Sequence, residues 1–310
     1  MEINEILLSI CIPTYNRSEI LNGNLSRIHN QIKGKNLPIE IIVSDNCSAD
    51  NTANIVQAHI SEGMPINYIR NNENLGMDGN FAQCYRRASG KYILVLGDDD
   101  YLRKGKLEKL LDYLSKGEYG LVHLKVASNS TEDIQVFDSS EEFLKNISFW
   151  ITYITSNIVN SKYVIGHDFE KYFGTYLTIV PLYLTSATSK DKNLLIYDRI
   201  FEDGKDSKTN GGYNFFEVFV TNYLSIWKQY ARKNKITNIL YSYIKYDIFK
   251  KYVVDRVIIL LILKQKGNFK TKSGWKILMY NYGYCPYFYS SLIHLLCKIF
   301  FTRIKRIFKI

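Results

Sequence analysis

Three consecutive carboxylates, Asp98, Asp99 and Asp100, are the most distinctive chemical feature of this sequence, and they directly follow the apolar run Leu94-Val95-Leu96-Gly97. Adjacent carboxylates repel one another unless a cation lies among them. Their oxygens are the ligands that Mg²⁺ and Mn²⁺ prefer, and such an ion in turn binds phosphate groups. Because side chains alternate along an extended segment, Asp98 and Asp100 can point the same way, while Asp99 points oppositely or anchors the turn. The run therefore predicts a buried strand that ends at a divalent-metal site, with an acidic surface turn as the alternative.

Three other apolar runs lie upstream of these carboxylates, and polar residues follow each of them. The runs, which we expect to form strands, are 7–12, 39–43 and 66–69, and the segments with helical patterning are 18–32, 50–61 and 78–88. Strand and helix thus alternate four times in about 95 residues, which predicts a parallel sheet with crossover helices. Sheets of this kind bind ligands at the carboxyl ends of their strands.

The polar residues at the strand ends form an ordered set of motifs. The set consists of Pro13-Thr14-Tyr15-Asn16-Arg17, Asp45-Asn46 with Ser48 and Asp50, Asn74-Leu75-Gly76 with Asn80, and Gly90-Lys91-Tyr92 ahead of the three carboxylates. In this order and spacing it resembles the nucleotide-sugar half of family 2 glycosyltransferases, most strongly over residues 5–125. The resemblance implies an α/β fold of the GT-A type, with a Rossmann-like, mixed and mainly parallel sheet flanked by helices. It also implies a nucleotide-sugar donor as co-substrate and Mn²⁺ or Mg²⁺ as cofactor.

The resemblance further implies which residues contact the donor. These are Pro13, Thr14, Tyr15, Arg17, Asp45, Asn74, Gly76, Asn80 and Asp98. The turn at 13–15 and Asp45 would bracket the base and the ribose, since a buried carboxylate needs a partner such as a base imide N–H or a ribose hydroxyl. The alternative for Asp45 is capping of the following helix, a role that we expect Ser48 or Asp50 to fill.

The loop after the third strand is rich in asparagine. Asn74 and Asn80 are expected to shape this loop beneath the ribose, although asparagines are equally common in ordinary surface turns. Gly76 is expected to serve the backbone geometry of the loop.

The acidic motif departs from the commonest form in the family, which is Asp, any residue, Asp, Asp. Aligning on the last two carboxylates puts Gly97 where the first Asp is usual, and Asp99 then becomes the best metal ligand, supported by Asp98 or Asp100. A subgroup that resembles the abequosyltransferases of bacterial surface-polysaccharide synthesis has the same Gly-Asp-Asp-Asp form. The departure is therefore compatible with a metal, and it leaves open which carboxylate contacts the ion.

The catalytic base is less clearly marked. By resemblance, inverting members of the family use an Asp or Glu in the second half of the domain to deprotonate the acceptor hydroxyl. The candidates are Asp168 and Glu170, at a helix expected over 168–187, and Asp203, after a strand expected over 194–201. Asp168 could equally supply negative charge to a helix N-terminus, and Asp203 could belong to an ordinary solvated turn. We favour Asp203 because of its spacing from the acidic motif.

Charge is unevenly distributed along the chain. Residues 1–204 hold 20 basic and 26 acidic side chains, whereas residues 205–310 hold 20 basic and 4 acidic ones. A basic segment of this size favours a polyanionic partner, and an anionic membrane surface or a phosphate-bearing lipid or polymer fits better than nucleic acid, for which no motif is recognised. Changes of pattern near 125 and 232 predict a nucleotide-sugar-binding half (1–125), an acceptor-binding half (126–231) and a basic, aromatic-rich helical region (232–310) that associates with a membrane.

The C-terminal segment and the two ends of the chain predict where the protein acts. Residues 292–310 place apolar residues and cations at helical spacing without any acid, which is typical of an interfacial amphipathic helix; packing of that helix on the domain is the alternative. The most apolar run, 257–263, is far shorter than the about 20 residues needed to span a bilayer and predicts a buried helix. The acidic N-terminus is unlike a secretory signal, and five scattered cysteines fit a reducing compartment. We expect a cytoplasmic protein that is peripheral on the inner face of the cell membrane.

Together these observations predict a metal-dependent, inverting glycosyltransferase that moves a sugar from a nucleotide-sugar donor to a glycan acceptor. The acceptor is expected to be lipid-linked, in bacterial surface polysaccharide (O-antigen or capsule) biosynthesis. Two alternatives stay open. One is a membrane-bound scaffold that has kept the fold and lost the chemistry, and the other is a sugar-phosphate nucleotidyltransferase, which normally begins with a Gly-rich, Lys-bearing loop that this sequence lacks after its first strand.

Overall fold

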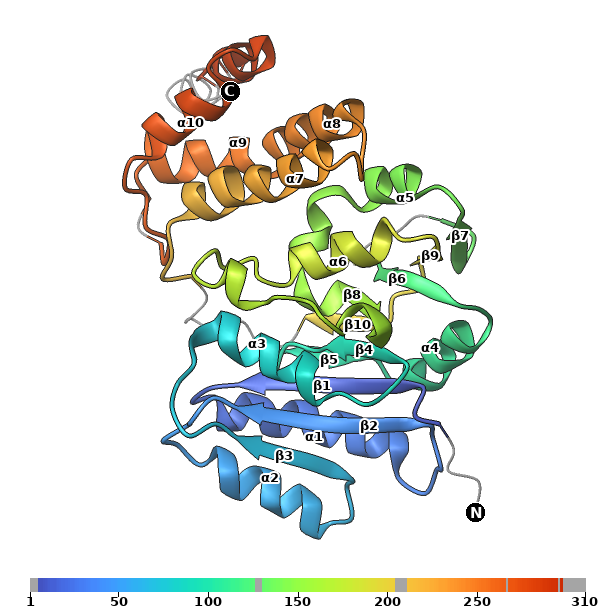
Figure 1. Cartoon of the computed structure of the whole chain (residues 1–310). Helices are drawn as coiled ribbons and strands as arrows, with labels where there is room; N and C mark the ends of the chain where they lie inside the picture. The colour runs from blue at the N-terminus through green and yellow to red at the C-terminus, as the bar shows by residue number, and fades with distance from the viewer. Residues whose placement is uncertain (1–4, 126–129, 204–210, 266, 295, 298–310) are drawn as a thin grey trace, which may run out of the picture. The chain divides into compact units, whose positions relative to one another are not determined.

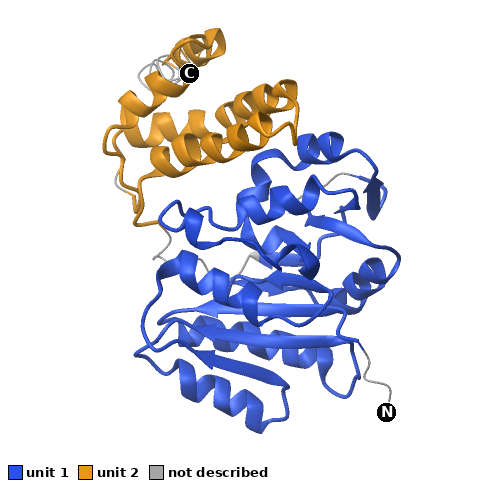
Figure 2. Cartoon of the chain, in the orientation of Figure 1, with its two compact units in different colours: residues 1–207 blue, residues 208–310 orange. Residues whose placement is uncertain are grey.

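The computed structural model describes residues 5–125, 130–203, 211–265, 267–294, 296 and 297 (Figure 1). The chain divides into two compact units, residues 1–207 and 208–310 (Figure 2).

The first unit is built on an eight-stranded sheet. In spatial order its strands are β3 (Ile66–Arg70), β2 (Ile39–Asp45), β1 (Leu8–Thr14), β4 (Tyr92–Val95), β8 (Asn157–Asn160), β6 (Tyr119–Leu124), β9 (Lys192–Ile196) and β7 (Ile134–Phe137). β8 and β7 run antiparallel to their neighbours, whereas β3, β2, β1 and β4 are parallel to one another. A separate antiparallel pair joins β5 (Asp100–Leu102) to β10 (Phe201–Asp203). The predicted mixed, mainly parallel α/β sheet is confirmed.

Helices cover both faces of the parallel half of this sheet. Strand order moves in one direction from β1 through β2 to β3, so right-handed crossovers place α1 (Ser18–Ile32) and α2 (Thr52–Ser61) on one face. The return from β3 to β4 reverses direction and places α3 (Gly76–Arg87) on the other. These three helices match the segments expected from the sequence to within two residues.

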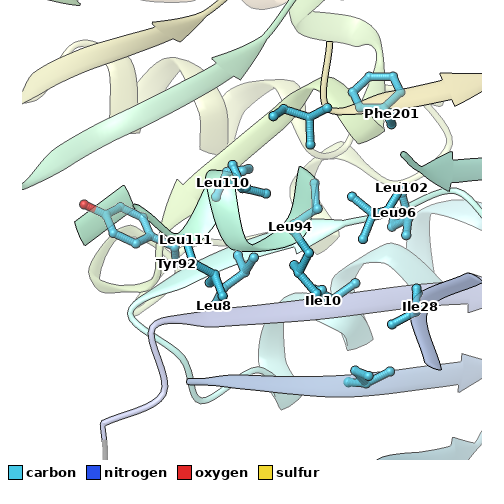
Figure 3. Close-up of a cluster of buried hydrophobic side chains, with 14 of the residues drawn as sticks. Leu8, Ile10, Ile28, Tyr92, Leu94, Leu96, Leu102, Leu110, Leu111 and Phe201 are labelled. Atoms are coloured by element: carbon cyan, nitrogen blue, oxygen red, sulfur yellow. The ribbon is translucent and has the colours of Figure 1, made fainter. Parts of the chain in front are cut away.

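Alternate residues of the strands build the core beneath α1, α2 and α4 (Lys106–Ser115). Leu8 and Ile10 of β1 lie beside Tyr92 and Leu94 of β4, and Leu110 of α4 belongs to the same cluster (Figure 3). The intervening residues of each strand point to the opposite face, as the two-residue period of a strand requires. The sheet is thus anchored on both sides, which fixes where its carboxyl ends lie.

Two expectations from the sequence need correction. The helix expected over 168–187 is a short 3₁₀ turn (Glu170–Tyr172) followed by α6 (Val180–Ala187). The two are separated because Gly174 and Tyr176 adopt positive φ and donate their backbone N–H groups to the Asp78 carboxylate, at 2.8 and 3.3 Å, instead of to a helical carbonyl. The strand expected over 194–201 is two strands, since β9 ends at Ile196 and β10 begins at Phe201 in the smaller sheet.

The second unit is helical in its described part. It contains α7 (Tyr223–Arg232), α8 (Asn238–Ile248), α9 (Val254–Arg256), α10 (Gly274–Tyr282) and three π-helical segments (Glu217–Asn222, Phe249–Val253 and Val257–Ile262). Its interior is aromatic, with fully buried side chains that include Trp227, Phe249 and Tyr282. Helices in the C-terminal region are therefore confirmed.

Of the two apolar C-terminal segments, the one expected to form a buried helix is described in full and the one expected at a membrane surface only in part. The apolar run 257–263 is largely π-helical, and Val257 and Leu260 are its buried members. In the described ranges, no helix combines the length and the apolar character needed to cross a bilayer. Most of the amphipathic helix expected at 292–310 lies outside the described residues.

Candidate functional site

The carboxyl ends of β1, β2 and β4 bring the acidic motif together with residues from the first two strands. Thr14, the last residue of β1, is in register with Asp45, the last residue of β2. β4 lies on the other side of β1, and the acidic motif begins three residues beyond its end. This is the edge at which parallel α/β sheets bind ligands.

Asp98 is held by two residues of the motif that follows β1. Thr14 Oγ1 donates to Asp98 Oδ2 at 2.9 Å, and Arg17 Nη1 donates to Asp98 Oδ1. Arg17 Nη2 also donates to Asp99 Oδ2 at 2.7 Å, so one guanidinium bridges two adjacent carboxylates. Asp98 is 2% exposed, and burial raises its pKa to about 6 even though Arg17 and Thr14 act in the opposite direction. Asp98 and Asp99 therefore share one cationic side chain, the Arg17 guanidinium.

Asp100 faces a different set of residues. Its Oδ1 accepts from the Tyr153 hydroxyl at 2.7 Å and its Oδ2 from Thr155 Oγ1 at 2.5 Å. The expectation that Asp98 and Asp100 point the same way is therefore wrong. The strand ends at Val95, so Asp98 and Asp99 lie in a turn where the alternation of an extended chain does not apply.

Asn24 of α1 holds this turn in place, although it is not among the site residues expected from the sequence. Its side-chain amide lies 3.0 Å from the Gly97 carbonyl, 3.2 Å from that of Asp98 and 3.0 Å from that of Asp100. Asn24 is fully buried on the face of α1 that also carries Leu21, Leu25 and Ile28. An asparagine among these core positions was the signal, because a buried amide needs partners.

The geometry accounts for glycine at position 97. A Cβ there would lie 2.8 Å from Asp100 Oδ2 and 3.2 Å from Asp99 Oδ1. A side chain at this position would displace the carboxylates, so glycine is part of this form of the motif.

The chemistry of these donors fits a hard divalent cation. Asp98 and Asp99 offer carboxylate oxygens, the ligands of Mg²⁺ and Mn²⁺. In the described part of the chain, however, the three carboxylates of the motif do not converge closely enough to surround one ion. Binding through Asp98 and Asp99 would require Arg17 to release them.

Asp45 is fully buried at the end of β2, with protein partners on both oxygens. Tyr68 donates its hydroxyl to Oδ2 at 2.6 Å, and the Ser48 backbone N–H donates to Oδ1 at 2.9 Å. Burial, together with the bond to Asp45, raises the pKa of Tyr68. The helix-capping role falls to Asp50 instead, whose Oδ1 accepts from the Thr52 backbone N–H at 3.1 Å.

The asparagines of the third motif tie the start of α3 to the end of β2. Asn80 exchanges two hydrogen bonds with Ser44, at 2.7 and 3.0 Å. Asn46 donates to Asn74 Oδ1 at 2.8 Å and to the Gly76 carbonyl at 3.2 Å, and Gly76 has a φ of 71°. Asn74, Gly76 and Asn80 thus shape the loop at this edge.

The first motif presents one large side chain to solvent. Tyr15 is 43% exposed, whereas its neighbour Pro13 is buried and in register with Ser44. Asn16 has a φ of 52° and is fixed to the second motif, because its backbone N–H donates to Ser48 Oγ at 2.9 Å.

The three candidates for the base lie in different surroundings. Asp203 is the last residue of β10 and its backbone is directly opposite Asp100 of β5. Glu170 is exposed and pairs with Arg86 at 2.5 Å, in the last turn of α3, about 15 Å along that helix from the edge where it begins. Asp168 is exposed and accepts from the Lys171 backbone N–H at 3.1 Å, which is a turn-capping contact.

Sequence comparison relates the chain to known glycosyltransferases. The family described as "Glycosyl transferase family 2" matches residues 9–175, which is more than half of the chain. Abequosyltransferase RfbV of Salmonella typhimurium is 46% identical over 110 residues, 35% of this chain and 33% of that protein. The GalNAc(5)-diNAcBac-PP-undecaprenol beta-1,3-glucosyltransferase of Campylobacter jejuni is 38% identical over 111 residues, 36% of this chain and 35% of that protein. The chain thus matches about a third of the length of these curated relatives.

Solved structures agree on the fold. S. aureus TarS 1-349 in complex with UDP-GlcNAc has a TM-score of 0.58 and 16% identity, covering 84% of this chain and 76% of that chain. The mannosyltransferase PcManGT of Pyrobaculum calidifontis in complex with GDP-Man and Mn²⁺ has a TM-score of 0.54 and 11% identity. The match covers 78% of this chain and 70% of that chain. The first unit therefore has the GT-A fold, and the chain belongs to glycosyltransferase family 2.

Proposed function

We propose that this chain is a glycosyltransferase that moves a sugar from a nucleotide-sugar donor to a glycan acceptor in bacterial surface polysaccharide assembly. The observation that carries the proposal is the cluster of Thr14, Arg17, Asp98 and Asp99 at the shared edge of β1 and β4. The names of its relatives support the substrate class, since one is an abequosyltransferase and another acts on an undecaprenol-linked glycan.

Donor binding is proposed to exchange the partners of Arg17. A nucleoside diphosphate brings negative charge to this edge, and a guanidinium is well suited to binding phosphate oxygens. When Arg17 turns toward the diphosphate, Asp98 and Asp99 become available as metal ligands. Bound there, Mg²⁺ or Mn²⁺ would neutralise the charge that develops on the departing diphosphate. The exposed Tyr15 offers an aromatic face for the base, beside the turn that Asp45 orders.

Asp203 is our choice for the base, supported by its backbone position opposite Asp100. Its carboxylate would take the proton of the acceptor hydroxyl as that oxygen forms its bond to the anomeric carbon. The bond between this carbon and the diphosphate oxygen breaks in the same displacement, so the anomeric configuration inverts. Asp168 and Glu170 are less well supported, because their observed contacts hold them in a surface turn and an ion pair.

A lipid-linked acceptor on the inner face of the cell membrane would account for the basic C-terminal part. Residues 205–310 carry 20 basic and 4 acidic side chains, and each cation near an anionic leaflet contributes about 1 kcal/mol to binding. Vesicles of phosphatidylglycerol should therefore retain the full chain in a flotation assay at low salt, and release it as ionic strength rises. Equal recovery with neutral phosphatidylcholine vesicles would contradict peripheral attachment through charge.

Thermal melting with a panel of nucleoside diphosphates, with and without Mn²⁺, tests the donor site. A ligand that binds only the folded state raises the melting temperature. We expect one nucleotide to produce an increase that requires Mn²⁺ and that Asp99→Asn abolishes. A sugar donor that carries this nucleoside diphosphate should then be consumed when acceptor is present. Nucleotide binding without turnover would favour a silent scaffold, and the absence of any increase would contradict the proposed donor site.

A further inference from the structure

A second cluster of ligand-type side chains lies at the other ends of the helices that flank the sheet. His29 is in the last turn of α1, His59 is in the last turn of α2, and Glu62 caps the C-terminus of α2. One ligand atom from each of the three lies within 4.8 Å of the others, and His29 Nδ1 is 3.9 Å from Glu62 Oε2. His59 and Glu62 are three residues apart, a spacing that places both on the same side of a helix turn.

Within the described ranges, one nitrogen of the cluster is buried without a hydrogen-bond partner. His59 is 7% exposed, and its Nε2 lies 2.8 Å from Asn22 Oδ1. Since that amide oxygen can only accept, Nε2 carries the proton and Nδ1 keeps its lone pair. Nδ1 takes part in no hydrogen bond with the residues that the structure describes. Buried polar atoms are seldom left unpaired, and metal-bound histidines usually donate their other ring N–H to an oxygen in just this way.

The surroundings favour a cation. Helix C-termini carry partial negative charge, and here two of them meet. Burial lowers the pKa of His59, an effect that the Glu62 carboxylate opposes. Because α1 and α2 run antiparallel to the strands that they follow, their C-termini lie at the amino edge of the sheet, opposite the carboxylate site.

We propose that His29, His59 and Glu62 bind one transition-metal ion of the Zn²⁺ class, which fastens the end of α1 to the end of α2. Two imidazoles and a carboxylate suit Zn²⁺ rather than Mg²⁺, and water would complete four-coordination. Tetrahedral bonds of about 2.1 Å require ligand atoms about 3.4 Å apart. The Glu62 side chain is 67% exposed, so it has room to rotate toward the two imidazoles.

Calorimetric titration of the full chain with Zn²⁺, as the only transition-metal ion present, tests this site. The Asp99→Asn background with excess Mg²⁺ removes the contribution of the carboxylate motif. We expect one Zn²⁺ per chain, and at least about tenfold weaker binding in His29→Gln and Glu62→Gln. His294→Gln, at an exposed histidine outside the cluster, is the matched control and should bind Zn²⁺ as the background does.

Spectroscopy on the same variants keeps the test decisive. Co²⁺ in place of Zn²⁺ should give the intense visible absorption of a four-coordinate ion, and His29→Gln should abolish it. His59→Gln changes a buried residue, so circular dichroism must first show that this variant is folded; if it is not, His29→Gln and the exposed Glu62→Gln decide. Absence of Zn²⁺ binding, or binding that neither of these two variants weakens, would overturn the proposal.

Discussion

The two edges of the sheet carry ion-binding side chains that are organised in opposite ways. At the carboxyl edge, Asp98 and Asp99 offer oxygens from a turn and already share the Arg17 guanidinium. At the amino edge, His29 and His59 offer ring nitrogens from helix ends, and His59 is oriented by the neutral Asn22. An ion at the carboxyl edge must therefore displace a cation, whereas an ion at the amino edge need not.

This difference suggests different uses. At the carboxyl edge, a metal ion can bind the carboxylates only when Arg17 leaves them. Binding of the ion is therefore coupled to binding of Arg17 by another anion, and a diphosphate is suited to this role. A site whose His59 is buried and whose ligands compete with no bound guanidinium suits an ion that stays bound. We therefore expect nucleotide to strengthen metal binding at the first site and to leave the second unchanged.

Asp99→Asn should give the largest effect that separates the two sites. Loss of a charged ligand at the point where charge develops should lower sugar transfer by about 10³-fold, and Zn²⁺ binding at the histidines should persist. Release of nucleoside diphosphate in the presence of acceptor measures the first, and Zn²⁺ titration measures the second. Asp112→Asn, at an exposed aspartate paired with Lys116, is the matched control. Retained transfer in Asp99→Asn would show that this carboxylate is not needed.

Asn24→Ala should show that the carboxylate site depends on its turn. Three backbone carbonyls lose a buried donor, which should lower the free energy of unfolding by about 2 kcal/mol and reduce transfer as well. Urea denaturation measures the stability. Asn54→Ala, at an exposed position of α2, should change it by no more than about 0.5 kcal/mol. Equal effects of the two substitutions would contradict the anchoring role of Asn24.

The pH dependence of stability should reveal the buried Asp98. Burial raises its pKa to about 6, so in metal-free protein the folded state holds this proton more tightly than the unfolded state does. Stability from this group is therefore lost as pH rises from about 4 to about 6. Asp98→Asn cannot titrate, so its free energy of unfolding relative to wild type should increase across this interval and level off above it. A difference that stays constant from pH 4 to pH 7 would show that Asp98 ionises normally.

The sequence could predict the carboxyl edge because its motifs are local. Each strand is followed within a few residues by its functional side chains, so the positions of Thr14, Asp45 and Asp98 followed from the order of strands. The contacts of Asn24 could not be predicted, since they join residues more than 70 positions apart.

Contacts between residues far apart in the sequence also explain why the interrupted helix and the histidine cluster were not predicted. The helix expected over 168–187 is interrupted because Asp78, 96 positions before Gly174, accepts the backbone N–H that the helix would have used. His29 and His59 lie in separate helices and form no recognisable motif. Only the packing of α1 beside α2 brings them together.

Asp50→Ala should give the smallest effect and tests whether the two ends of the helix pair are independent. Asp50 accepts from the backbone N–H of Ser18, the first residue of α1, at 2.9 Å and from that of Thr52, the first residue of α2, at 3.1 Å. Its removal should cost about 1 kcal/mol of stability, as loss of a helix cap usually does. The proposed zinc ligands lie about 16 Å further along α1, so the increase in melting temperature produced by Zn²⁺ should be the same in wild type and variant. If Zn²⁺ no longer raised the melting temperature of Asp50→Ala, the two ends of the helix pair would act as one unit. The histidine cluster would then depend on the contacts that Asp50 makes at the carboxyl edge of the sheet.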